Sequence, residues 1–266
     1  MSKVKKIAIV AIFLIVIGAV GSFITFQSMG QSSSVNEERV IDSTNFTDIE
    51  VSADNQQVEI FPTDDSKAKV ELEGRSSKDI AEKLSVEVKG NKLSIKIKDK
   101  HTFNFFNFTA SQLTLRVYLP KKTYDSLQVD IDNGALLAEQ LNVKNIHAET
   151  SNGTLELKDM EATALRVESD NGEIELENVT GEIQGETDNG EITLVTPNLN
   201  RPITLDSDNG RITIETDKEP TNVTFDVQVD NGDVTIFDKY NGNAVFGNGE
   251  NRIKLSTDNG DITVSK

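Results

Sequence analysis

An Asn-Gly pair recurs at nearly constant intervals through the second half of the sequence, and this repeat constrains the fold more than any other feature. Successive glycines of the pair are 19, 19, 18, 20, 22 and 28 residues apart. A fixed period of this size is typical of solenoids, in which each copy forms one structural unit. The predicted turn residues are Asn133, Gly134, Asn152, Gly153, Asn171, Gly172, Asn189, Gly190, Asn209, Gly210, Asn231, Gly232, Asn259 and Gly260.

Alignment on these glycines shows the same apolar alternation in every copy. In the copy around Gly172, the apolar residues are Leu165 and Val167 before the corner and Ile174 and Leu176 after it. Three positions before the glycine, most copies have a small Thr or Ser on the inward side. Each copy therefore reads as a strand, a tight corner and a second strand.

Two all-β architectures fit this unit. Asn-Gly is a strong signal for a two-residue hairpin turn, so the copies could be seven hairpins of an antiparallel sheet. Alternatively, each copy is one coil of a β-solenoid whose strands pair with the coils above and below. We favour the solenoid, because a small inward residue at the same place in each copy suits a narrow bend in stacked coils.

The N-terminal part of this region is less regular. Residues 46–130 read as degenerate early coils that form a cap, with Gln56 in the place of the turn glycine, and residues 131–266 read as regular coils. The segment 76–84 is the one candidate for a soluble helical turn. In the 28-residue copy, residues 241–251 are expected to bulge as a loop from one corner.

Residues 7–26 are free of charge, and a helix of this length can cross a ~30 Å hydrocarbon core. Lysines before the segment favour a cytoplasmic tail at 1–6 and an extracytoplasmic C-terminal region, as expected of a single-pass protein of the cell membrane. Residues 27–45 are small and polar and predict a flexible linker. The alternative is a signal peptide cleaved near Ala19, Val20 and Gly21.

The charge balance limits the partners. The chain has 27 Lys and Arg against 44 Asp and Glu, a net charge of −17. Such a field repels nucleic acid and anionic lipid headgroups and attracts cations, cationic peptides and basic protein surfaces. There is no cysteine, which excludes disulfides and thiolate metal sites. No nucleophile or metal-protease motif is present, so we predict no catalytic residue, no metal ligand and no cofactor.

The stretch LTLRVYLPKKTYDSLQVDIDNG (113–134) and the Asp-Asn-Gly coils after it resemble a bacterial family of unknown function labelled "putative adhesins". The resemblance covers residues 40–266 and is greatest to the LiaG-like, membrane-anchored members of cell-envelope stress operons. It implies a right-handed single-stranded β-helix and a role in the cell envelope, and it supplies no catalytic residues.

Acidic residues occupy two outward positions beside each corner. The acidic residues that stand two positions before each glycine, such as Asp170 and Asp188, are expected to cap the turn by accepting backbone N–H groups. The Asn of the corner is expected to take the left-handed conformation. The Asn side chains could also bond one another in a ladder between coils. The acidic residues that stand four positions before each glycine have no role in forming the turn. They are either a solvated face or a binding site for divalent cations or cationic peptides, and they are Glu149, Glu168, Glu186 and Asp206.

A phenylalanine cluster is the other candidate. Phe103, Phe105, Phe106 and Phe108 fall within six positions and form either a flap over the solenoid or a patch that contacts a protein or a membrane. The residues predict a non-enzymatic envelope protein that acts as an interaction scaffold, with an unknown envelope protein as partner, and the resemblance implies a link to stress response or adhesion. A binder of cations or cationic peptides is one alternative, and a polysaccharide-active enzyme is another.

Overall fold

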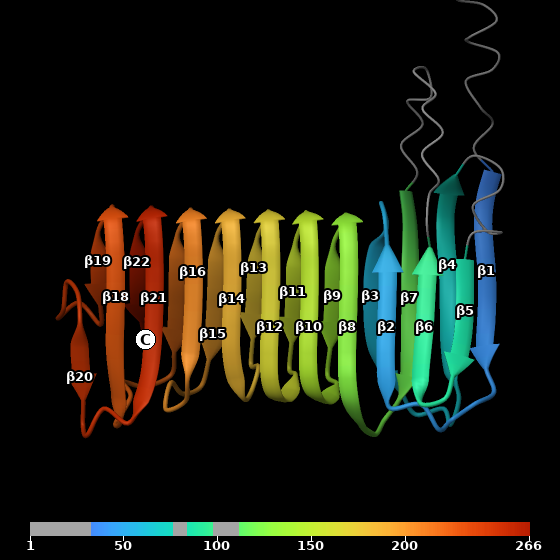
Figure 1. Cartoon of the computed structure of the whole chain (residues 1–266), viewed down its shortest axis with the longest axis horizontal. Helices are drawn as coiled ribbons and strands as arrows, with labels where there is room; N and C mark the ends of the chain where they lie inside the picture. The colour runs from blue at the N-terminus through green and yellow to red at the C-terminus, as the bar shows by residue number, and fades with distance from the viewer. Residues whose placement is uncertain (1–32, 77–83, 98–111) are drawn as a thin grey trace, which may run out of the picture.

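The computed structural model describes residues 33–76, 84–97 and 112–266, and within them the chain is all β (Figure 1). Two sheets of eleven strands lie face to face. Sheet A runs in the order β1 (Ser33–Ile41), β4 (Ala68–Ser76), β7 (Gln112–Pro120), β3 (Gln57–Thr63), β9 (Leu136–Glu139), β11 (Leu155–Lys158), β13 (Ile174–Glu177), β15 (Ile192–Thr196), β17 (Ile212–Thr216), β22 (Ile262–Ser265) and β19 (Val234–Ile236). Sheet B runs in the order β20 (Ala244–Phe246), β18 (Val223–Asn231), β21 (Asn251–Asn259), β16 (Ile203–Asn209), β14 (Glu182–Asn189), β12 (Glu161–Asn171), β10 (Asn142–Asn152), β8 (Thr123–Asn133), β2 (Asp48–Ala53), β6 (Lys92–Ile97) and β5 (Leu84–Lys89).

Parallel pairing between copies decides between the two predicted architectures. Strand β10 pairs in parallel with β8 on one side and β12 on the other, and β11 does the same with β9 and β13. A hairpin would pair the two strands of one copy in antiparallel register, so the hairpin alternative is wrong. Each copy is a coil that places one strand in each sheet, as the repeat predicted.

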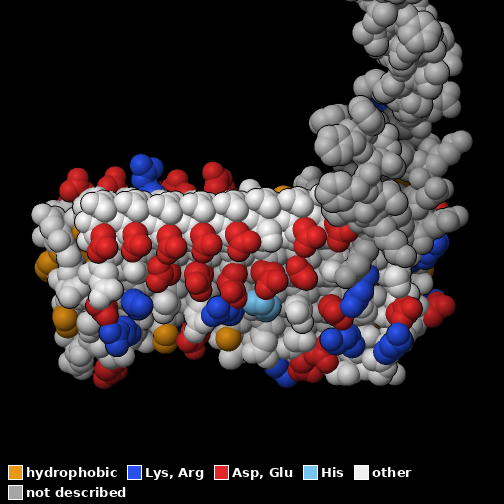
Figure 2. Space-filling view, turned by 45° about the horizontal axis from the view of Figure 1, so that its top comes forward, with side chains coloured by type: hydrophobic (Ala, Val, Ile, Leu, Met, Phe, Trp, Pro, Cys, Tyr) orange, Lys and Arg blue, Asp and Glu red, His pale blue; other side chains and the backbone are white. Residues whose placement is uncertain are grey.

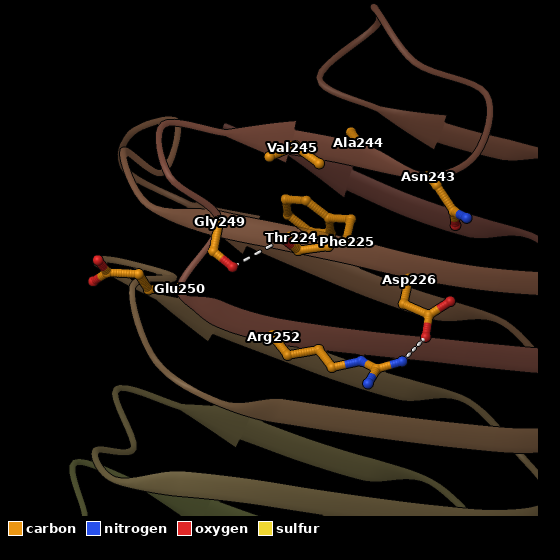
Figure 3. Close-up of a pocket in the computed structure, with 9 residues that line it drawn as sticks. All are labelled: Thr224, Phe225, Asp226, Asn243, Ala244, Val245, Gly249, Glu250 and Arg252. Carbon is orange, nitrogen blue, oxygen red and sulfur yellow. Dashed lines mark hydrogen bonds and ion pairs between the residues drawn. The ribbon is translucent and has the colours of Figure 1, made fainter.

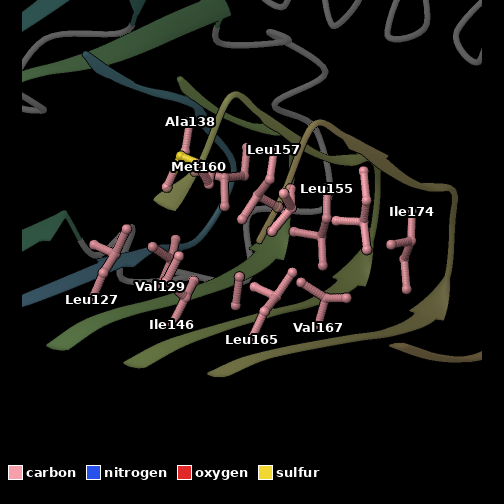
Figure 4. Packing of buried hydrophobic residues seen from close by; sticks show 14 of the residues in the cluster. Leu127, Val129, Ala138, Ile146, Leu155, Leu157, Met160, Leu165, Val167 and Ile174 are labelled. Carbon is pink, nitrogen blue, oxygen red and sulfur yellow. The ribbon is translucent and has the colours of Figure 1, made fainter. Parts of the chain in front are cut away.

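The core lies between the sheets and consists of columns of like residues, one from each coil (Figure 4). Leu165, Val167, Ile174 and Leu176 are all at most 2% exposed, which confirms the inward positions of the alignment. Close packing extends to the one gap in a column. A Cβ built on Gly185 would lie 3.0 Å from a methyl carbon of Leu205, so the larger leucine of the next coil occupies the space that the glycine leaves.

The corner glycines are required by the close stacking of coils. A Cβ built on Gly153, Gly172, Gly190 or Gly210 would lie 1.6–1.8 Å from the carbonyl oxygen of the preceding corner glycine. No side chain fits there. Gly172, Gly190 and Gly210 do not have a positive φ, and neither does any of the corner asparagines, so the predicted left-handed Asn is wrong. Steric room selects Gly at these corners, while the φ values of 147° at Gly153, 153° at Gly232 and 157° at Gly260 also favour Gly.

The asparagines of the same corner form the ladder that the repeat suggested. Each side-chain amide donates to the side-chain oxygen of the neighbouring Asn, as in Asn189 Nδ2 to Asn171 Oδ1 at 3.1 Å and Asn209 Nδ2 to Asn189 Oδ1 at 3.1 Å. The corner backbone is held as well, because the N–H of each stacked glycine donates to the carbonyl of the Asn in the next coil. The ladder comprises Asn55, Asn133, Asn152, Asn171, Asn189, Asn209, Asn259 and Asn231.

Left-handed residues occur at the opposite corner instead. Gln140, Asp159 and Asn178 have φ values of 55°, 51° and 53° and sit at equivalent places after β9, β11 and β13. The longer copies place their extra residues here, in 197–202 and 217–222. This placement agrees with the predicted bulging from one corner for those two copies.

The order of coils in space departs from the order in sequence at both ends. The last coil of the chain, β21 and β22, lies between β16 and β17 on one side and β18 and β19 on the other. At the other end, β2 and β3 lie between β8 and β9 and the later strands β6 and β7. At the C-terminal end, β18 and β19 form the outermost coil, although β21 and β22 follow them in the sequence. At the other end, β6 and β7 lie outside β2 and β3, although β2 and β3 precede them in the sequence.

Two predictions about irregular segments are wrong. Residues 241–251 are not a loop bulging from a corner, because β20 within them pairs antiparallel with Val223–Phe225 at the end of sheet B. Residues 27–45 are not wholly a flexible linker, because β1 pairs antiparallel with β4. The unpaired edge of β4 offers backbone groups that attract a strand, whatever the polarity of the segment that supplies it.

The proposed helical turn at 76–84 lies mostly outside the described residues, and the apolar segment 7–26 lies wholly outside them. Within the described ranges, no helix has the length and hydropathy to cross a membrane. Gln56 does occupy the glycine place of its corner, and its buried side-chain oxygen accepts the backbone N–H groups of Asp54 and Asn55.

Candidate functional site: an acidic strip on sheet B

Strand register turns the repeated acids into two parallel columns on the outer face of sheet B (Figure 2). We call these two columns the acidic strip. Neighbouring coils are about 4.8 Å apart, so each carboxylate lies beside the next in its column. The first column contains Asp132, Asp170, Asp188, Asp208, Asp258 and Asp230, with Ser151 as its one interruption. The second contains Asp130, Glu149, Glu168, Glu186 and Asp206.

The first column does not cap the corner. Among the described residues, none of its Asp side chains forms a hydrogen bond or an ion pair, and all are exposed. The predicted cap is wrong because the Asn ladder and the glycine backbone bonds already satisfy the corner. These carboxylates are therefore free to interact with solvent or with a ligand.

The second column has basic side chains along one side only. His147 Nε2 lies 3.3 Å from Glu149, and its Nδ1 lies 3.6 Å from Glu168. Arg166 pairs with Glu168 and lies 3.6 Å from Glu186. These side chains belong to the column two residues upstream on the same face. Exposed pairs of this kind contribute about 0.2–1 kcal/mol each, so they offset only part of the repulsion along the strip.

Asp206 is a partly buried acid of the second column. Burial raises the pKa of its carboxyl above the ordinary value, Lys254 lowers it, and the charges of Asp208 and Asp258 raise it further. The carboxylate form is therefore less favourable here than it is in water. A cation that approaches the strip here would relieve that cost.

The strip suits an extended, flexible polycation better than a single metal ion. Within the ranges that the structure describes, no three His, Asp or Glu side chains are grouped so as to hold a metal. The carboxylates lie in straight rows, spaced by the pairing distance of strands, and do not converge on a point. A straight row matches a ligand that presents positive groups along its own length.

The C-terminal end of the solenoid is a second distinctive surface. We call it the tip, formed by β18, β19 and the segment 237–250, which contains β20 and leads to β21. Aromatic rings cover part of it, where Phe237 and Phe246 pack edge to face against Phe225. Beside β20 is an open depression of about 640 Å³ with the Asp226–Arg252 ion pair on its floor and exposed Val245 on its rim (Figure 3).

The sequence predicted two sets of site residues, and the structure describes one of them. Glu149, Glu168, Glu186 and Asp206 lie together in one column, as the alternation predicted. The phenylalanine cluster at 103–108 lies outside the described residues. Sequence reasoning gave no role to His147 and did not mention Arg166 or Lys254. All three stand six positions before a corner glycine, and extending the alignment by one outward position would have placed them beside the strip.

A family model described as Toastrack DUF4097 matches residues 46–169 and again residues 138–265. The chain belongs to the Toastrack DUF4097 family. This Toastrack protein is 28% identical over 117 residues to the uncharacterized protein YvlB of Bacillus subtilis (strain 168), a match that spans 41% of this chain and 30% of YvlB.

Solved structures similar to this Toastrack protein match it at low identity and with low TM-scores. A "putative adhesin" from Bacteroides fragilis has a TM-score of 0.46 and 14% identity, with 88% of this chain and 98% of that chain covered. A "putative adhesin" from Parabacteroides merdae has a TM-score of 0.39 and 14% identity, covering 89% and 97%.

Proposed function

We propose that this Toastrack protein is a non-enzymatic interaction module of the bacterial cell envelope, anchored by residues 7–26, whose acidic strip binds a cationic peptide or a basic protein segment. The observation that carries the proposal is the in-register strip, in which the first-column carboxylates have no protein partner among the described residues. A net charge of −17 increases the rate at which cationic partners arrive.

The location in the envelope is supported by the sequence. Residues 7–26 are long enough to cross a bilayer, and the lysines before them favour a cytoplasmic N-terminus. Protease added to intact spheroplasts is expected to remove the C-terminal region and leave a short protected N-terminal fragment. A chain that resists protease until the cells are lysed would contradict the predicted topology. The resemblance of residues 40–266 to membrane-anchored members of cell-envelope stress operons supports a role in adhesion or envelope stress.

Binding to the strip can be tested with defined probes. The full-length chain in nonionic detergent is titrated with fluorescent deca-lysine, and binding is expected to weaken steeply as salt rises. Replacement of Glu149, Glu168 and Glu186 by Gln together with Asp206 by Asn is expected to weaken binding at least tenfold. The matched control replaces four exposed acids by Gln, namely Glu175, Glu177 and Glu215 of sheet A and Glu173, which directly precedes β13.

Because the two variants have the same net charge, the comparison separates the strip from the overall field. Equal loss of affinity in both variants would contradict a specific strip. Titration with calcium tests the divalent-cation alternative. We expect that any calcium binding is the same in the parent and in the variant with four altered acids of the second column. Release of glycan fragments from purified cell wall would overturn the non-enzymatic part of the proposal.

A further inference from the structure

The tip is the exposed end of the outermost coil, and no further coil of the described chain covers it. In the inner coils the columns that contain Val227, Val229 and Val234 are buried, as shown by their register partners Leu255, Thr257 and Ile262, which are at most 2% exposed. At the tip the three valines are only partly buried. Val227 and Val229 lie on β18 before the glycine corner, and Val234 lies on β19 after it.

The backbone of β18 is also open along this stretch. Strand β20 pairs with β18 only at Val223–Phe225, and no strand of the described chain pairs with the outer side of residues 226–231. The side-chain oxygen of Asn243 accepts the N–H of Val227 at 2.7 Å, which shows that this N–H points outward. Strand alternation then points the N–H of Val229 outward as well, with no partner among the described residues.

The charges around the open edge are acidic. Asp230 and Asp233 flank the last corner, and Asp258 lies in the next coil. None of these three carboxylates forms an ion pair within the described chain. Outward-facing side chains of a strand added here would lie beside Gln228 and Asp230, and its inward-facing ones beside Val227 and Val229.

We propose that the open edge of β18 at residues 227–231 binds an extended peptide segment of a partner protein by strand addition, with apolar residues at alternate positions and Lys or Arg between them. The added strand completes the hydrogen-bond ladder at Val229 and covers the exposed valines, and its basic residues pair with the acids of the tip. This inference extends the proposed function to a second site, separate from the residues of the second acidic column.

A second copy of this chain is a poorer occupant of the edge. Two tips brought together would place Asp230 and Asp233 of one copy near the same acids of the other, which is unfavourable. The tip also lies at the opposite edge of sheet A from β1, which follows the proposed anchor. Copies in one membrane would therefore present their tips in the same direction, towards partners and away from one another.

The test uses one backbone change at the edge. Val229→Pro removes the outward N–H, and proline is tolerated on an edge strand where that N–H does not serve the ladder. Val229→Ala is the matched control, because it shortens the side chain and keeps the N–H. The probe is a fluorescent ten-residue peptide of alternating Val and Lys, titrated into the full-length chain in nonionic detergent. A peptide of alternating Val and Glu controls for charge.

Val229→Pro is expected to weaken binding of the Val-Lys peptide at least tenfold, and Val229→Ala less than threefold, with both variants melting within a few degrees of the parent. Hydrogen exchange at the Val229 amide is expected to slow when the peptide binds. Unchanged affinity in Val229→Pro would overturn the proposal. So would self-association of the chain that Val229→Pro abolishes, because the occupant would then be a second copy.

The variant with the four altered acids of the second column separates this site from the strip. It is expected to bind the Val-Lys peptide within threefold of the parent while losing deca-lysine. Loss of both ligands in that variant would assign the peptide to the strip and overturn the tip site. Loss of the peptide in Val229→Pro alone, with deca-lysine binding absent in every variant, would support the tip and contradict the strip.

Discussion

The inner coils and the tip are built from the same repeat, and they differ in what covers each side. An inner corner such as Gly190 has a coil on both sides, so its backbone bonds, its Asn ladder and its core columns are all complete. The last corner, at Gly232, has a coil on one side only. The comparison teaches that the role of a repeated residue depends on the position of its coil in the stack. The Asp-Asn-Gly motif is the same in inner and end coils, so the motif alone does not predict that position.

The largest difference is expected for the corner glycines. Gly190→Ala places a Cβ 1.8 Å from the carbonyl oxygen of Gly172, so two coils must separate. We expect a loss of about 4 kcal/mol or more in unfolding free energy, or failure to fold. Gly242→Ala in the tip segment meets nothing within 4 Å and is expected to change stability by about 0.5 kcal/mol or less. Urea denaturation measures both, and equal effects would contradict the conclusion that a stacked corner has no room for a Cβ while the tip segment does.

Matched valines give the next largest contrast. Val167 and Val227 occupy the same column, but Val167 is fully buried and Val227 is half-buried at the tip. Val167→Ala is expected to cost about 2 kcal/mol, and Val227→Ala about 1 kcal/mol or less, because less apolar surface is lost. Chemical denaturation of the two variants tests this. A larger loss at Val227 would show that the tip is closed in solution, which would contradict the docking proposal because its free surface would be covered.

The chemistry of the nine Asn-Gly pairs should follow the same contrast. Deamidation begins when the glycine nitrogen attacks the Asn side-chain carbonyl and ammonia leaves. In the inner corners the glycine N–H donates to the next coil and the Asn amide is held in the ladder. Asn241 is exposed, and Gly242 has open space around it. Peptide mass spectrometry after incubation at pH 8 is expected to show deamidation first at Asn241, with the inner corners intact. Early deamidation at Asn189 would contradict a rigid ladder.

The smallest effect is expected at Asp206. Its pKa is raised in the folded chain, so the folded state binds more protons than the unfolded state between the unfolded and the folded pKa. Its contribution to stability therefore falls as pH rises through that window. Asp206→Asn is expected to stabilise the protein at pH 7 by about 0.5 kcal/mol or less after solvent screening, and the gain should shrink as the pH falls into the range where Asp206 is protonated.

Thermal melting across pH measures the gain, with Asp208→Asn as the control for loss of one charge from the neighbouring exposed column. We expect a smaller stabilisation in the control, because Asp208 is the more exposed of the two. Destabilisation by Asp206→Asn at neutral pH would mean that the carboxylate makes a favourable interaction there.

Much of the fold could be predicted from local pattern. Alternation around Gly172 gave the strands, the inward columns and the outward acids, because side chains of a strand alternate strictly between its two faces. The resemblance in residues 113–134 led to the same family that the family model matches. The reason for the corner residues could not be predicted in the same way. Whether Gly is needed for its φ or for room, and whether Asp170 bonds the turn, depend on the atoms of the neighbouring coil.

The sequence by itself determined the repeating unit, its two strands, its corner and the face on which its acids lie, because these follow from interactions within about 20 residues. Only the tertiary structure decided the order in which the units stack, the strands that close the ends and the edge of β18 that stays open. These depend on which unpaired sheet edge each segment meets after the chain folds back, and the copies are too alike in sequence to specify their neighbours.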